Sequence, residues 1–262
     1  MNTKEKIKSF WEVNPCGKRL IPFEEGTREF FEAVDKRRYE NEPFILDAAD
    51  FARHKGKKVL EIGCGLGSDF MKFVENGADA YAIDLTNTAV EFTKKRMQIF
   101  GFPDFVEHVK QADAENLPFQ NNEFDMVYSW GVLHHTPDTE KAFFETLRVL
   151  KPGGEFIGML YNKYSTVTFL VLLYFGILRG GLLRKSWREV LSENTVGPGN
   201  ALTKAYTKQE LENIFSNFEN VRVEPVLTVS IRLPKFVNFF MKRVPRRFGW
   251  FWVVHAKKSS IS

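Results

Sequence analysis

The chain has 262 residues, of which 44% are hydrophobic, and a formal net charge of +4. This length and composition are ordinary for a folded protein with a sizeable core and argue against general disorder. The charge suits an anionic partner or membrane surface, but it is too small for a dedicated nucleic-acid binder, so the sequence carries no strong nucleic-acid signal.

The two cysteines, Cys16 and Cys64, lie far apart in the sequence. They provide neither a disulfide framework nor a zinc ligand set, so we expect no metal and a cytoplasmic location. The first residues contain no apolar run of signal-peptide length, which predicts that the chain is not secreted. The uncharged stretch from Thr166 to Leu178 is shorter than the roughly 20 residues of a membrane span. We therefore expect it to form a buried or interfacial helix.

Along the chain, residues 1–54 predict an N-terminal helical cap, with helical spacing at Phe30, Phe31 and Val34. From Lys58 to about Tyr161, short apolar runs typical of strands alternate with amphipathic helical stretches. These segments are, in order, KVLEI, GSDFMKFVENG, ADAYAID, TNTAVEFTKKRMQIFG, VEHVKQA, FDMVYSW, DTEKAFFETLRVL and GEFIGMLY. Such alternation implies right-handed crossovers and a doubly wound α/β fold, with a mostly parallel sheet covered on both faces.

The rest of the chain completes this plan. Residues 55–161 are predicted to be a ligand-binding core, residues 162–206 a lid or acceptor-site insertion, and residues 207–262 the remainder of the sheet. Local signals place helix caps at Thr86 and Asp138 and a helix end at Lys151. In the last part we expect a helix at Thr207 to Phe215 and strands at Val221 to Val229 and at Trp250 to Ala256.

A glycine-rich turn follows the first strand. Gly63, Gly65 and Gly67 stand between the strand and a helix, and Ser68 occupies the place of the third glycine of a dinucleotide fingerprint. Glycines allow a tight turn and close approach of a ligand, although such joints also arise for packing reasons. The spacing favours a ligand other than a pyrophosphate cofactor.

Two acidic positions follow the next strands. Asp84 lies about 20 residues beyond the first glycine, the offset at which an open α/β sheet places an acid for ribose hydroxyls. The alternative is that Asp84 only supports the helix that begins near Thr86. Asp113 and Ala114 can read an adenine edge with a carboxylate and a backbone amide, or they can belong to an ordinary acidic loop.

Five motifs in order resemble the class I methyltransferases, in particular the branch that methylates quinones and other small molecules. They are VLEIGCGLG, the acid Asp84, DAENLPF, FDMVYSWGVLHHTPD and LRVLKPGG. The segments FWEVNPCG and RRYENEPFI also resemble the cap that closes over the cofactor in small-molecule methyltransferases. The resemblance implies a seven-stranded sheet with one antiparallel strand near its edge, and S-adenosyl-L-methionine as cofactor.

The resemblance also implies roles for individual residues. Those expected to bind the cofactor are Glu61, Gly63, Cys64 and Gly65 in the glycine-rich turn, Asp84 at the ribose, Leu85 on the adenine, Asp113 and Ala114 at its edge, and Ser129 and Trp130 facing the amino acid moiety.

Methyl transfer from a sulfonium needs mainly positioning, and it needs a general base only when the acceptor must lose a proton. His134 and His135 follow the fourth strand and are the candidate bases, although either can be a packing residue. The candidates for the acceptor pocket are Tyr161, Tyr164 and Tyr206, which can equally be core residues.

The main hypothesis is methylation of a small, lipophilic acceptor. The alternatives are methylation of RNA or protein, and a non-catalytic cofactor-binding subunit; SWGVLHH lacks the Asn/Asp-Pro-Pro-Tyr signature of many nucleic-acid and protein methylases. Two apolar stretches edged by basic residues, TVTFLVLLYFGILRGGLLRKSWR and KFVNFFMKRVPRRFGWFW, suit peripheral membrane association. They are equally consistent with a core bordered by solvated charges.

Overall fold

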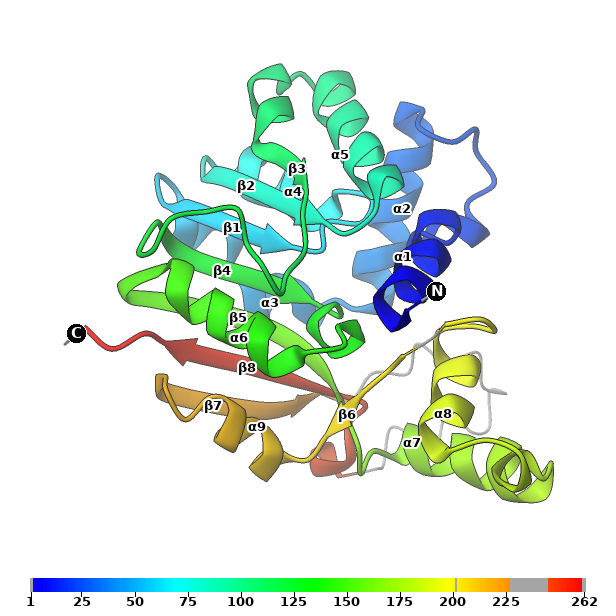
Figure 1. The fold of residues 1–262 in the computed structure, drawn as a ribbon. Coiled ribbons are helices and arrows are strands. Elements are labelled where there is room, and N and C mark those ends of the chain that lie inside the picture. Colours follow the sequence, from blue (N-terminus) through cyan, green and yellow to red (C-terminus); the bar gives the residue numbers. More distant parts are fainter. Residues whose placement is uncertain (1, 201, 227–244, 261–262) are drawn as a thin grey trace.

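The computed structural model describes residues 2–200, 202–226 and 245–260 (Figure 1). A mixed sheet runs through the molecule with strand order β3-β2-β1-β4-β5-β8-β7, and the short strand β6 pairs with β5. The strands are β1 Lys58–Ile62, β2 Asp79–Asp84, β3 Val109–Gln111, β4 Phe124–Trp130, β5 Leu150–Asn162, β6 Ala205–Tyr206, β7 Glu219–Val226 and β8 Phe251–Lys257.

Strands β1 to β5 run parallel, whereas β8 runs antiparallel to both β5 and β7. The inner strands are apolar on both sides, since Val59, Leu60 and Ile62 are all buried, as expected for a sheet covered on both faces. The predicted doubly wound sheet with one antiparallel strand near its edge is confirmed, and β6 adds a two-residue strand to the expected seven.

Helices cover the two faces of the sheet. Phe70 and Phe73 of α4 and Met97 of α5 pack on one face, and Phe143 of α6 and Leu211 of α9 pack on the other. The α-helices are α1 Thr3–Val13, α2 Arg28–Asn41, α3 Phe44–Ala49, α4 Ser68–Glu75, α5 Asn87–Phe100, α6 Thr139–Val149, α7 Thr166–Val171, α8 Trp187–Thr195 and α9 Lys208–Ile214. Short 3-10 helices lie at Lys18–Leu20, Phe51–His54, Pro103–His108, Leu133–His135, Gly181–Leu183 and Arg246–Phe248, and a π-helix (η5) lies at Leu172–Leu178.

The predicted helix caps are present. Thr86 accepts from the backbone N–H of Ala89 at the start of α5, and Asp138 accepts from that of Lys141 at the start of α6. The helix end predicted at Lys151 was wrong: α6 ends at Val149, because β5 already begins at Leu150, which pairs with Phe124.

Other predicted boundaries also shifted. The strand expected over VEHVKQA starts as a 3-10 helix and pairs with β2 only over Val109–Gln111. The helix expected at Thr207 to Phe215 is α9, with Thr207 as its cap, and the two following strands are β7 and β8. The end of the first of these strands, residues 227–229, lies outside the described residues, as does much of KFVNFFMKRVPRRFGWFW.

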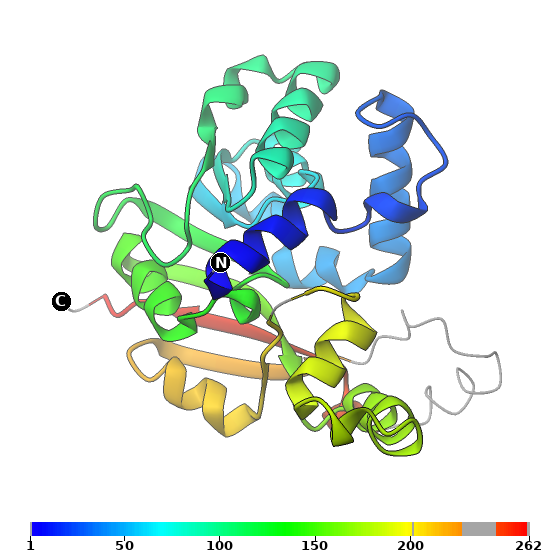
Figure 2. The ribbon, with the colours of Figure 1, turned by 45° about the vertical axis from the view of Figure 1, so that its right-hand side comes forward.

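Two helical groups flank the sheet at the carboxyl ends of its parallel strands (Figures 1 and 2). Helices α1 to α3 precede β1, in the region predicted as a cap. Helices α7 and α8, with η5 between them, follow β5, in the region predicted as an insertion. The division into four domains stays a prediction, although these groups fall within its ranges.

The apolar stretch from Thr166 to Leu178 forms α7 and η5 instead of one regular helix. Val167 and Val171 are buried in the main core, whereas Phe169, Ile177 and Leu178 are exposed. In the described part of the chain, no helix is long and apolar enough to cross a membrane.

Candidate active site

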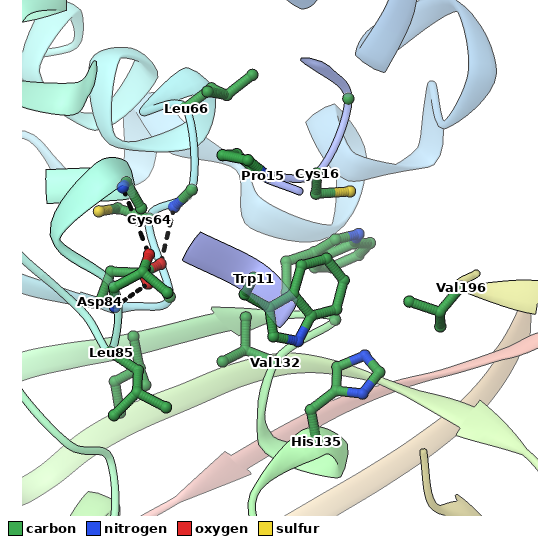
Figure 3. A pocket seen from close by; sticks show the side chains of 18 of the residues that line it. Trp11, Pro15, Cys16, Cys64, Leu66, Asp84, Leu85, Val132, His135 and Val196 are labelled. Carbon is green, nitrogen blue, oxygen red and sulfur yellow. Dashed lines mark hydrogen bonds between the residues drawn. The ribbon is translucent and has the colours of Figure 1, made fainter. Parts of the chain in front are cut away.

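A cavity of about 540 Å³ opens at the carboxyl ends of β1, β2 and β4 (Figure 3). Its wall combines the turn after β1, the end of β2, the loop after β3 and the end of β4 with residues from α1, α2 and α8. This is the edge at which open α/β sheets bind ligands, because the strand order reverses there.

The turn after β1 has the backbone shape that its glycines predicted. Gly63 has a φ of 85°, and a Cβ there would come within 2.2 Å of the Val132 side chain. Gly65 has a φ of 54°, and a Cβ there would meet no atom within 4 Å, since this glycine borders the cavity. The open space beside Gly65 can therefore take part of a ligand. The neighbouring Cys64 also lines the cavity, with its thiol 3.4 Å from Thr93 Oγ1.

Asp84 connects this turn to α5. One of its carboxylate oxygens accepts from Gly65 N (3.1 Å), and the other accepts from both the backbone N–H and the hydroxyl of Thr86. Burial raises the pKa of Asp84, and these hydrogen bonds partly offset that rise. Three of the roughly four acceptor positions of a carboxylate are thus used, which leaves one for a ligand hydroxyl. The supporting role and the ribose role are therefore compatible in one side chain.

Glu61 is the acid that faces the cavity without a partner. The residue is 3% exposed, and its Oε2 has no hydrogen-bond partner among the described residues. Burial and the nearby Asp69 carboxylate raise the pKa of Glu61 well above its ordinary value. An unpaired buried carboxyl group is costly unless something compensates it. An ammonium group bound in the cavity would supply both the charge and the hydrogen bond.

Asp113 lies in the loop after β3 and faces α1. Asp113 and Glu115 both accept from the ammonium group of Lys4, and Asp113 also accepts from Glu115 N at 2.9 Å. Ala114 is buried and lines the cavity next to them, as does Leu85 after β2. The loop predicted to read an adenine edge is therefore held in place from the N-terminal helix.

The structure shows four polar residues that the sequence analysis did not include. Asp69, 1% exposed in the first turn of α4, accepts from Arg38 and from the hydroxyls of Tyr39 (3.0 Å) and Tyr128 (2.9 Å). This network ties the cap to the sheet directly below Glu61. Asp69 could have been noticed as an acid next to the glycine-rich turn, but nothing in the sequence indicates that Arg38, 31 residues away, is its partner.

The two histidines lie in different environments. His135 lines the cavity, and its Nδ1 lies 2.8 Å from the carbonyl oxygen of Leu202. Because a carbonyl oxygen only accepts, Nδ1 carries the proton and Nε2 keeps a lone pair. Burial lowers the pKa of His135 to about 4, so the ring is neutral at pH 7.

His134 is fully buried beneath this wall and packs on Tyr161 with ring centres 4.2 Å apart. Neither of its ring nitrogens has a hydrogen-bond partner in the part of the chain that is described. Burial lowers the pKa of His134 well below its ordinary value. Its placement favours the alternative of a packing residue and does not support a catalytic role.

Three further predicted site residues lie away from the cavity. Ser129 is buried behind its wall, with its hydroxyl donating to the carbonyl oxygen of Ile62 at 3.1 Å, whereas Trp130 does line the cavity. Of the three candidate tyrosines, only Tyr161 lines it. Tyr164 is 68% exposed, and Tyr206 lines a separate pocket beside α6 and α9. Tyr164 lies beyond the end of β5 at Asn162, and Tyr206 packs in the core cluster that contains Leu211 and Phe215.

Helix α1 forms one wall of the cavity. Trp11 packs edge-on against His135 with ring centres 5.3 Å apart, and Ile7 and Phe10 are buried along the same helix (Figure 3). Glu12 accepts from the backbone N–H groups of Asn87 and Thr88 at the start of α5. Since Lys4 binds the loop after β3, both ends of α1 are attached to the sheet domain across the cavity.

A family model described as "Methyltransferase domain" matches residues 60–158. Phthiotriol/phenolphthiotriol dimycocerosates methyltransferase of Mycobacterium tuberculosis is 37% identical over 103 residues, which cover 38% of this chain and 36% of that protein. Ubiquinone/menaquinone biosynthesis C-methyltransferase of Cronobacter sakazakii is 32% identical over 46% of this chain and 48% of that protein. Residues 60–158, which are less than half of the chain, thus match a methyltransferase domain.

Solved structures agree with this assignment at the level of the fold. Geranyl diphosphate C-methyltransferase of Streptomyces coelicolor superposes with a TM-score of 0.61 at 14% identity, covering 100% of this chain and 99% of that one. A SAM-dependent methyltransferase of Archaeoglobus fulgidus gives a TM-score of 0.56 at 16% identity, covering 87% and 94%. The matches to the curated relatives span less than half of those proteins.

The match to a methyltransferase domain implies S-adenosyl-L-methionine as the cofactor, and the cavity fits it on three observations. The unpartnered Glu61 suits the ammonium group of the methionine moiety, and the open space beside Gly65 admits its chain. Asp84 retains an acceptor position for a ribose hydroxyl. The individual roles of these residues stay predictions.

Proposed function

We propose that this chain transfers a methyl group from S-adenosyl-L-methionine to a small lipophilic acceptor. The observation that carries the proposal is the composition of the cavity beyond the predicted cofactor residues. There its wall includes large apolar and aromatic side chains from four separate elements, namely Trp11, Met159, Tyr161, Val196 and Phe251. Such side chains suit the apolar body of a ligand, and polar groups elsewhere in the lining can orient it by hydrogen bonds.

The names of the relatives support the same class of acceptor. They include the mycobacterial dimycocerosate and the quinone methyltransferases described above, and a sterol 4-C-methyltransferase of Caenorhabditis elegans that is 33% identical over 107 residues. The cavity also has Arg19 and Arg37 in its lining, so an acceptor with a polar or acidic head and an apolar body fits best.

The chain's own residues would contribute mainly position and exclusion of water. The cofactor supplies a methyl group on a positively charged sulfur. Trp11 and the rest of α1 cover the cavity, which keeps water out and limits the orientations of the acceptor. His135 presents the lone pair of Nε2, since Leu202 holds its Nδ1–H. The neutral ring can therefore accept a hydrogen bond, and with it a proton, from an acceptor hydroxyl or an acidic carbon, but its low pKa makes it a weak base.

The test uses purified protein, methyl-labelled S-adenosyl-L-methionine and a boiled extract of the host, followed by counting of label in organic, aqueous and macromolecular fractions. We expect label in the organic fraction. Label in protein or RNA would replace the proposal with the macromolecular alternative. Cofactor binding by calorimetry without transfer to any fraction, in fresh or boiled extract, would support the non-catalytic subunit.

A further inference from the structure

The hairpin formed by α7, η5 and α8 exposes an unusual group of apolar side chains. In both ribbon views it projects beyond the end of β5, away from the sheet (Figures 1 and 2). Its exposed side chains, here called the apolar tip, are Phe169, Tyr174, Ile177, Leu178, Leu182 and Leu183. At the extreme, Leu178 is 70% and Leu183 is 89% exposed. Scattered apolar residues on a surface need no explanation, whereas six within fifteen residues are a group that an interaction site would explain.

The hairpin is firmly anchored on its other side. Val167 and Val171 of α7 and Leu191 of α8 belong to the main hydrophobic core, and Gly176 is buried where the chain passes close to Leu182. The exposed side chains are therefore held outward by a packed base. This arrangement distinguishes the apolar tip from a poorly folded segment.

The charges within the segment that carries the apolar tip have one sign. Residues 163–188 contain five basic side chains and no acidic one, namely Lys163, Arg179, Arg184, Lys185 and Arg188. Arg184 and Lys185 directly follow Leu183 and are exposed, and Arg179 lies over the ring of Tyr174 at 5.4 Å. Glu193 and Glu189 begin the acidic side of α8, where Glu193 pairs with Lys185.

We propose that the apolar tip docks on a membrane surface that contains anionic lipids. Leucine and isoleucine side chains would enter the boundary between headgroups and acyl chains, while Arg179, Arg184 and Lys185 would contact phosphate groups. A protein partner is the less suitable occupant, because this tip is an outward projection with cations around it, which complements an anionic lipid surface. The proposal does not depend on the proposed methyl transfer.

The position of the hairpin also bears on how a lipophilic molecule could reach the cavity. Thr195 and Val196, at the end of α8, line the cavity, while the start of the same helix adjoins the apolar tip. A membrane bound by the tip would thus lie close to the α8 side of the cavity, from which a lipophilic molecule could enter.

Flotation on a density gradient tests the docking, with no cofactor or acceptor present. The protein is mixed either with vesicles of phosphatidylcholine and phosphatidylglycerol in equal parts or with pure phosphatidylcholine vesicles. We expect the wild type to float with the anionic vesicles. The double variant Leu178→Ser/Leu183→Ser should bind at least about tenfold more weakly, because two fully inserted side chains are lost. Arg184→Gln/Lys185→Gln should weaken binding and reduce its salt dependence.

The matched control is Phe23→Ser, which removes a side chain that is 48% exposed and precedes α2, outside the hairpin. It should float like the wild type, and circular dichroism should show all variants folded. The proposal is overturned if the wild type binds neither vesicle type, or if Phe23→Ser loses binding as strongly as the tip variant. It is also overturned if the wild type self-associates without lipid and the tip variant is monomeric, since the tip would then join two copies of the chain.

Discussion

At the scale of single residues, Asp84 combines two roles that the sequence presents as alternatives. It holds the turn at Gly65 and the cap at Thr86, and it retains room for one further donor. A carboxylate in this position both shapes the glycine-rich turn and offers an acceptor to a ribose.

We expect Asp84→Ala to weaken binding of S-adenosyl-L-methionine by about 10- to 100-fold, because hydrogen bonds to a charged group are each worth about 1.5–3 kcal/mol. Isothermal titration calorimetry measures the change. The control is Thr86→Ala, which removes a partner of Asp84 and the cap of α5 but keeps the carboxylate. Equal cofactor affinity in Asp84→Ala and wild type would show that Asp84 has only the supporting role.

The two adjacent histidines also differ in position, since His135 lines the cavity and His134 does not. His135→Gln keeps an N–H that can donate to Leu202 but removes the group that accepts a proton. For an acceptor that loses a proton, we expect the rate of methyl transfer to fall by about 100-fold or more, with unchanged cofactor affinity. His134→Phe is the control and should keep most activity, because His134 packs beneath the wall. A full rate in His135→Gln would exclude His135 as the base.

His135→Gln also tests how the buried histidine affects the stability of the folded protein at different pH values. The pKa of His135 falls from its ordinary 6.5 to about 4 in the folded protein. Between these values the unfolded chain binds more protons than the folded one, so this contribution to stability is complete above pH 6.5 and is lost as the pH falls towards 4. From pH 7 to pH 5 the wild type should lose about 2 kcal/mol more stability than His135→Gln. Urea unfolding at both pH values measures this, and an equal loss in the two proteins would contradict the shifted pKa.

At the scale of elements, α1 covers the cavity that is predicted to bind the cofactor. Its buried side chains Ile7 and Phe10 line the cavity, and its ends are attached by Lys4 and Glu12. These contacts join segments more than 70 residues apart in the sequence. Local helix propensity predicts that residues 3–13 form a helix, but it does not predict that this helix covers the cavity.

Breaking both attachments should loosen α1 without unfolding the sheet. We expect Lys4→Met/Glu12→Gln to increase hydrogen exchange over Thr3–Val13 and to speed cofactor dissociation. Hydrogen-exchange mass spectrometry and stopped-flow release provide the measurements. Lys6→Met is the matched control, since Lys6 is exposed on the same helix. If α1 exchanges at the wild-type rate in the double variant, its apolar side chains alone hold it.

At the scale of the whole molecule, the cavity joins parts of the chain that lie far apart in the sequence. Strands β1, β2 and β4 provide its floor, while α1, α2 and α8 provide its walls. A ligand that contacts all of these strands and helices should raise the free energy of unfolding of the whole domain.

We therefore expect S-adenosyl-L-methionine at about 100 times its dissociation constant to add about 2.7 kcal/mol to the free energy of unfolding. For a chain of this size, this corresponds to a rise in Tm of about 5–10 °C. Differential scanning calorimetry detects it, and Asp84→Ala at the same cofactor concentration should show a much smaller rise. The absence of any rise in the wild type would contradict cofactor binding in the cavity.

The sequence by itself determined the parts of this protein that depend on short-range patterns. The alternation of strands and helices, the glycine-rich turn and the caps at Thr86 and Asp138 are encoded within a few residues of where they act. The placement of Asp84 and Asp113 at one edge also followed from sequence, because the carboxyl ends of parallel strands meet there.

Tertiary structure alone decided which side chains face the cavity. Adjacent residues such as His134 and His135 take different directions, and Tyr161 and Tyr164 separate because a strand ends between them. The pairing of Arg38 with Asp69 and the closure by α1 depend on how distant elements pack, which no local pattern in the chain records. The physical reason is that a side chain's surroundings are set by long-range packing, whereas its backbone conformation is set largely by its neighbours in sequence.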